Sequence, residues 1–125
     1  MLVGVQDVQV NVADMARALA FYRDVLGMRV VDSNAWWTSL DFFGARIGLH
    51  GTGGAAVPAI AHDEHGPLAG AVLTLRSTDL DADLAYLRAS GVAVLGRSDH
   101  AWGRLALIRD PDGNLLKLMQ PASTR

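Results

Sequence analysis

The strongest constraint on the fold is that the second half of the chain repeats the first. At a constant spacing of 65 residues, four positions of the first half match four of the second: Asp14, Ala20, Phe21 and Arg23 match Asp79, Ala85, Tyr86 and Arg88. Farther along, residues 44–49 (GARIGL) match residues 113–118 (GNLLKL) at a spacing of 69, so the second half is slightly longer. Two copies of one unit predict two modules of the same fold.

The first copy has the pattern of one strand, one helix and three further strands. Residues 8–12 alternate valine with polar residues, as a half-buried strand does. Asp14 is placed to cap a helix, and Gly27 is placed to end it. The strands that we expect next cover about residues 28–32, 35–43 and 46–50. The first copy is therefore predicted to be a βαβββ module.

The second copy repeats this order. A strand is expected at residues 71–75, followed by a helix that Asp79 caps and Gly91 ends. Further strands are expected near residues 92–95, 102–109 and 115–120. The sequence DPDGN at residues 110–114 is typical of a tight turn, because Pro presets φ and Gly and Asn tolerate positive φ. It joins the last two strands into a hairpin.

A segment of low periodicity separates the copies. Residues 52–68 are rich in Gly and Pro, so we expect a linker or mobile loop there. The chain of residues 1–125 is then one domain, with module one at about 5–51 and module two at about 69–120. The loop could also close over a ligand as a lid, although a tether between the modules is the more economical interpretation.

These patterns predict an α+β fold of two tandem βαβββ modules. Each module has one helix, which can cover only one face of its sheet. The uncovered faces are expected to turn toward each other and form a cup-shaped, partly open barrel.

Composition excludes several classes of function. The chain has no cysteine, which excludes disulfides, thiolate catalysis and zinc bound through Cys. The net charge of −2 comes from scattered charges of both signs, so we expect neither nucleic acid nor a membrane as partner. The first residues do not resemble a leader, and no stretch approaches the ~18 apolar residues of a membrane span. We therefore expect a cytoplasmic protein.

The motifs resemble those of the vicinal oxygen chelate superfamily, also called the glyoxalase, bleomycin-resistance and extradiol-dioxygenase superfamily. The resemblance runs from Asp7 to Gln120, and its most specific parts are residues 11–15 (NVADM), 20–28 (AFYRDVLGM) and 110–114 (DPDGN). The resemblance implies paired βαβββ modules, a ligand held on their concave face and, often, a homodimer.

Metal-dependent members of that family place up to four ligands at equivalent strand positions. By register these positions are Asp7, Gly48, Val72 and Lys117. Asp7 is the only metal-competent residue among them, because Gly48 and Val72 have no donor atom and a protonated Lys117 has no lone pair. We therefore favour no cofactor, and a divalent metal is kept only as an alternative.

Alternation along the strands predicts which residues line the concave face. Beside the family positions, this face is expected to carry cations and aromatic rings suited to a small anionic or aromatic ligand. The residues that we expect to bind it are Asp7, Gln9, Trp37, Arg46, His50, Thr74, Arg76, Trp102, Arg104 and Lys117. His50 is the candidate for proton transfer, because the pKa of an imidazole lies nearest neutrality. His62 and His65 lie in the loop and are expected to be solvated.

The sequence leaves three functions open. The leading prediction is a glyoxalase-like protein that binds a small molecule without the usual metal centre, as bleomycin-resistance-like proteins do. The alternatives are a divalent-metal-dependent lyase, isomerase or dioxygenase, and a catalytically silent interaction module. A homodimer is the expected assembly, and the identity of the ligand is not encoded in any motif.

Overall fold

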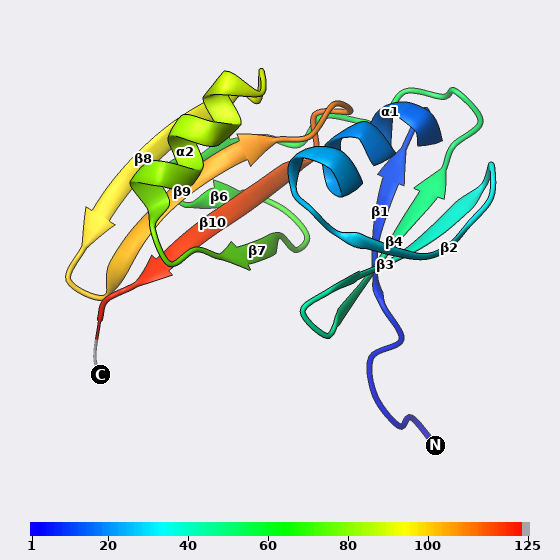
Figure 1. Cartoon of the computed structure of the whole chain (residues 1–125), viewed down its shortest axis with the longest axis horizontal. Coiled ribbons are helices and arrows are strands. Elements are labelled where there is room, and N and C mark those ends of the chain that lie inside the picture. Colours follow the sequence, from blue (N-terminus) through cyan, green and yellow to red (C-terminus); the bar gives the residue numbers. More distant parts are fainter. Residues whose placement is uncertain (124–125) are drawn as a thin grey trace. The chain divides into compact units, whose positions relative to one another are not determined.

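The computed structural model describes residues 1–123 and divides the chain into two compact units, with the boundary between Pro58 and Ala59 (Figure 1). Each unit has its own four-stranded mixed sheet, and neither sheet closes into a barrel. The predicted α+β fold of two tandem βαβββ modules is confirmed. The arrangement of both sheets around one cup stays a prediction.

The first unit contains β1, two consecutive helical segments and three more strands. In its sheet the order is β1-β4-β3-β2, with β1 parallel to β4 and the other pairs antiparallel. The bounds are β1 Val8–Val12, α1 Met15–Leu19, η1 Ala20–Val25, β2 Arg29–Ser33, β3 Trp37–Phe42 and β4 Ala45–Gly51.

The second unit repeats this topology, with strand order β7-β10-β9-β8 and β7 parallel to β10. Helix α2 lies across one face of the sheet (Figure 1). The bounds are β7 Leu73–Arg76, α2 Leu80–Ala89, β8 Val94–His100, β9 Gly103–Arg109 and β10 Leu115–Pro121. Strand β8 is longer than the predicted residues 92–95, and it bulges between Val94 and Gly96.

Both predicted helix caps are confirmed. The side chain of Asp14 accepts a hydrogen bond from the backbone N–H of Arg17, and that of Asp79 accepts one from the N–H of Ala82. Each carboxylate thereby satisfies a donor that the first turn of a helix leaves without a partner. The caps fix where the helices begin, and through them which residues face the sheets.

The first helix is not a regular α-helix. After α1 the chain continues as the π-helical segment η1, and the N–H of Leu26 donates to the carbonyl of Phe21 five residues earlier. The wider turn brings Phe21 and Tyr22 into the core, where they are 5% and 0% exposed and their rings meet edge to face. Single π-turns of this kind cannot be read from apolar spacing, because they shift the helical phase by one residue.

The segment predicted as a structureless linker at residues 52–68 is partly ordered into a hairpin. Strands β5 His62–Asp63 and β6 Gly66–Pro67 pair antiparallel, and the N–H of Leu68 donates to the carbonyl of Ala61. The hairpin belongs to the second unit and contacts β10 there. The prediction failed because two-residue strands are too short to show alternation.

Each unit has a separate apolar core between its sheet and its helix. In the first unit Leu40, Ile47 and Leu49 of the sheet are buried beside Ala18 of α1. In the second unit one side of α2 is buried against residues from three strands. The buried residues are Leu80, Leu84 and Leu87 of the helix and Leu75, Ile108, Leu116 and Leu118 of the sheet. Among residues 1–123, no helix is long and apolar enough to cross a membrane.

Candidate functional site

The sheet face opposite α1 in the first unit, here called the open face of that unit, carries most of the polar residues predicted there. Strand register places Gln9 beside Gly48, Gly48 beside Ser39, and His50 beside Trp37. The alternate residues of these strands face the helix, since the hydroxyl of Thr38 is 3.2 Å from Sδ of Met15 in α1. Gln9, Trp37, Arg46 and His50 therefore share one face, as alternation predicted.

The indole of Trp37 occupies the space that a side chain at position 48 would need. A Cβ atom built on Gly48 would fall closer than 3.0 Å to Cζ2 and Cη2 of this indole. The indole Nε1–H donates to Oγ of Ser39 at 2.9 Å, and the ring centroid is 6.4 Å from that of His50. The missing side chain at position 48 thus lets an aromatic ring rest against the strand, held at one end by a hydrogen bond.

The charges on the open face of the first unit are only partly paired. Asp41 of β3 forms an ion pair with Arg29 at 3.6 Å, and the residue opposite it on β4 is Arg46. Asp7 precedes the first residue of β1, so it lies at the entrance to that strand and not within it. The open face therefore combines the indole platform with an imidazole and a guanidinium.

The open face of the second unit, opposite α2, is cationic. Lys117 of β10 pairs with Thr74 of β7, and Met119 pairs with Arg76. Val72, like Asp7, precedes its strand. On β9 the residues that share this face are Leu105 and Leu107, which pair with Met119 and Lys117.

The predicted orientation of β9 was wrong. Arg104 pairs with Gln120, and the alternate residues Ala106 and Ile108 pair with Leu118 and Leu116, all on the side of α2. Trp102 precedes β9 in the turn after β8. The cause is that residues 105–108 are all buried, so the strand is apolar on both faces and its alternation carried no information.

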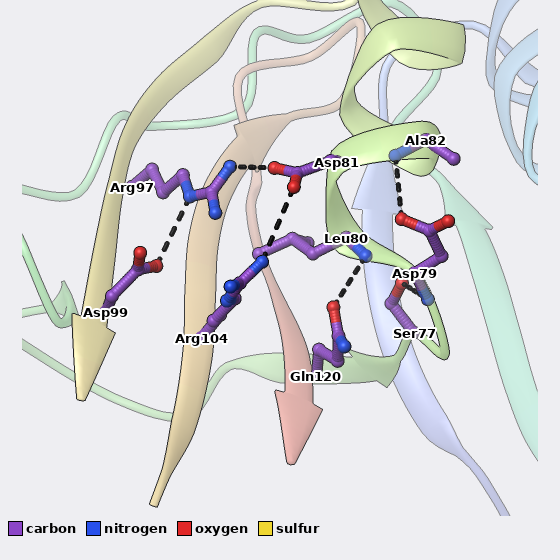
Figure 2. Close-up of polar contacts among 9 residues, drawn as sticks. All are labelled: Ser77, Asp79, Leu80, Asp81, Ala82, Arg97, Asp99, Arg104 and Gln120. Atoms are coloured by element: carbon purple, nitrogen blue, oxygen red, sulfur yellow. Dashed lines mark hydrogen bonds and ion pairs between the residues drawn. The ribbon is translucent and has the colours of Figure 1, made fainter. Parts of the chain in front are cut away.

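Arg104 instead joins an ion-pair cluster between α2 and the sheet (Figure 2). Asp81 of α2 contacts Nη1 of Arg97 on one oxygen and Nη1 of Arg104, at 3.4 Å, on the other. Arg97 also contacts Asp99 at 3.3 Å. The hydrogen bond from Arg97 holds the pKa of Asp81 below its ordinary value, and the charge of Arg97 adds to this effect.

The hairpin β5–β6 lies against the open face of the second unit. A Cβ on Gly66 would be 3.8 Å from Cε of Lys117, and the rings of His65 and His100 have centroids 6.0 Å apart. His100 stacks in turn on Trp102, at 4.5 Å and 2°. The contact of His65 with His100 had no signal in the sequence, because it joins a loop to a distant strand end.

The donor chemistry at the family positions does not fit a metal centre of the usual kind. Gly48 offers no side chain and its space is filled by Trp37, while Val72 is aliphatic and Lys117 is a cation. Within residues 1–123, no three His, Asp or Glu side chains are grouped so that they could hold a metal ion.

The chain matches the family model of the Glyoxalase/Bleomycin resistance protein/Dioxygenase superfamily over residues 4–118. It belongs to this superfamily. The predicted resemblance is thereby confirmed over nearly the whole length. No curated protein matches the chain.

Solved structures agree with this membership. TnmS3, an antibiotic-binding protein from Streptomyces sp. CB03234, is 32% identical, with 97% of this chain and 98% of that chain covered and a TM-score of 0.70. The integron cassette protein VCH_CASS1 of V. cholerae is 28% identical, covering 96% and 97%, with a TM-score of 0.65. The fosfomycin resistance protein FosX of Listeria monocytogenes shares the fold at 15% identity, covering 98% and 96%, with a TM-score of 0.78.

Proposed function

We propose that the protein binds a small anionic or aromatic molecule on the open faces of its sheets, without the metal centre of the superfamily's enzymes. The observation that carries this proposal is the indole of Trp37 resting on Gly48. Because its Nε1–H is held by Ser39, this ring offers aromatic surface to a planar ligand at little cost in conformational entropy. His50 beside it can donate or accept a hydrogen bond.

The charges of the second unit support the same class of ligand. Lys117 and Arg76 lie on one face with the hydroxyl of Thr74, and the neighbouring residues of β9 on that face are leucines. Two cations beside apolar side chains attract an anion more strongly than they would in open water. The 32% identity to TnmS3, which is an antibiotic-binding protein, favours binding over chemistry. A homodimer is part of the proposal, and light scattering of the purified protein tests it.

The test is a fluorescence titration with a panel of planar and anionic small molecules. Trp37→Phe is expected to weaken binding of a planar ligand by about tenfold, because the smaller ring loses both area and the bond to Ser39. Trp36→Phe is the matched control, since this neighbouring indole is 64% exposed and lies away from Gly48. Equal affinities for the two variants would contradict the role of Trp37.

The cationic part is tested at Lys117, which is the only lysine of the chain. After reductive methylation with a ¹³C label, the NMR signal of the labelled side chain therefore comes from Lys117 alone, and the N-terminal amine gives the one other labelled signal. Lys117→Met is expected to weaken anionic ligands and leave neutral ones unchanged. Elemental analysis of protein purified without chelator distinguishes this proposal from the metal-dependent alternative, and about one Ni, Zn, Mn or Fe per chain would overturn the proposal.

A further inference from the structure

A cavity of about 300 Å³ lies in the second unit, where β10 ends and β9 begins. Its lining includes His100, Gly103, Arg104 and Gln120, and it contains none of the open-face residues on which the proposed function rests. No acidic residue lines it among the residues that the structure describes. The volume is at the lower end of the range for small-molecule sites, so a ligand of single-ring size is the largest that fits well.

Arg104 supplies the charge of this cavity. It shares Asp81 with Arg97, but Arg97 is the more tightly held of the two, because it also contacts Asp99. Arg104 reaches Asp81 through Nη1 at 3.4 Å, and its side chain is 46% exposed. A guanidinium has five N–H donors, so this single long contact leaves a fork of donors for a carboxylate.

Gln120 supplies a neutral donor whose orientation is fixed. Its Oε1 accepts the backbone N–H of Leu80 at 2.8 Å, at the first turn of α2 (Figure 2). Because the oxygen is the acceptor in this bond, the amide Nε2 carries its two protons on the other side of the group. Gln120 pairs with Arg104 across β9 and β10, so both donors come from adjacent strands.

His100 supplies the flat part of the site, and Trp102, which does not itself line the cavity, stacks on its ring. Their rings are parallel to within 2° at 4.5 Å, and Nε2 of His100 lies 2.9 Å from Oγ of Ser98. The imidazole is therefore held on one side by an indole and at one nitrogen by a hydroxyl.

We propose that this cavity is a second binding site, for a small planar carboxylate of the aromatic-acid class. The carboxylate pairs with the guanidinium of Arg104 and the amide of Gln120, and the ring lies beside the imidazole of His100, which Trp102 supports from outside the cavity. This site shares no lining residue with the parts of the open faces on which the proposed function rests, since its lining comes from the ends of β8, β9 and β10 and the residues that follow β10.

The experiment is a titration of the full chain with benzoate, followed by the NMR signals of the His100 imidazole and the Gln120 side-chain amide, which both line the cavity. We expect both signals to shift with a Kd on the order of 1 mM, as suits a ligand of this size. Benzamide, which lacks the charge, and cyclohexanecarboxylate, which lacks the flat ring, are each expected to bind about tenfold more weakly. Equal binding of benzoate and benzamide would overturn the proposal.

Variants locate the site. Arg104→Gln is expected to weaken benzoate by about tenfold, whereas Arg97→Gln, which removes the other guanidinium on Asp81, leaves the affinity unchanged. Equal losses in both variants would mean that charge near α2, and not the cavity, attracts the ligand. Lys117→Met separates the two sites, because it is expected to leave the benzoate-dependent shift of Gln120 unchanged even where it weakens an anion bound at the open face. If Arg104→Gln does not fold, the three ligands on the unaltered protein still decide.

Discussion

Gly48→Ala is expected to destabilise the first unit, although alanine is ordinarily the better residue in a strand. The added methyl would lie closer than 3.0 Å to the indole of Trp37, so the ring must leave its place. Displacement costs the hydrogen bond to Ser39, about 0.5–1.5 kcal/mol, and part of the packing of a large ring. Overpacking of this kind costs about 1–3 kcal/mol in total, which outweighs the gain of about 0.5–1 kcal/mol from replacing glycine.

A double-mutant cycle isolates the cause. With Trp37→Ala in place, the methyl at position 48 has room, so Gly48→Ala is expected to be neutral or slightly stabilising in that background. Urea denaturation, extrapolated linearly, gives the free energy of unfolding for all four proteins. Gly96→Ala in β8 is the control, because no atom outside its chain neighbours lies within 4 Å of its Cβ position.

The reasoning is refuted if Gly48→Ala costs the same with and without Trp37. Such a result would mean that the backbone of β4, and not the indole, opposes a side chain at position 48. A shift in the emission of Trp37 provides an independent check, since an indole displaced from the strand becomes more exposed to water.

Three further predictions concern stability elsewhere in the chain. The pKa of Asp81 is lowered in the folded protein, so its ion pair with Arg97 contributes fully to the free energy of unfolding above the unfolded pKa, which is near 4. This contribution is lost as the pH falls through the lowered folded pKa. Asp81→Asn should therefore make the urea midpoint depend less on acid pH. Asp110→Ala should cost about 2–3 kcal/mol by thermal or urea unfolding, because the buried carboxylate accepts bonds from both the backbone and side-chain nitrogens of Asn114; an unchanged midpoint would contradict this. Phe43→Asn should stabilise by about 0.5–1 kcal/mol, since Phe43 has φ of 51° in the turn between β3 and β4 and is 96% exposed; a lower melting temperature would count against it.

The sequence predicted the parts of the fold that rest on local chemistry. Asp14 and Asp79 cap their helices as expected, and the DPDGN turn joins β9 to β10 through the side chain of Asp110. These features depend on a few neighbouring residues, so the residue types alone identify them. The repeat then supported the same order of strands and helix in both modules, because a helix or strand signal that is weak in one copy is clear in the other.

The candidate site was predicted only where alternation was clear. Strand β3 presents Trp37 and Ser39 on one face and buries Thr38 and Leu40 on the other, and its orientation was correct. Strand β9 is buried on both faces from Leu105 to Ile108. Its orientation was therefore predicted from a single polar residue, Arg104, and this prediction was wrong. The contact of Arg104 with Asp81 depends on how α2 crosses the sheet, which no local pattern encodes.

The glycine at position 48 sets a steric limit on what this strand of the first sheet can carry. The superfamily's fourth-strand ligand and the indole of Trp37 require the same volume, so a chain can have one or the other there. A substitution that restores a carboxylate at position 48 would also expel the aromatic ring. A change at position 48 alone would therefore not rebuild the family's ligand set, because Val72 and Lys117 provide no ligand either, and it would displace the indole from the strand.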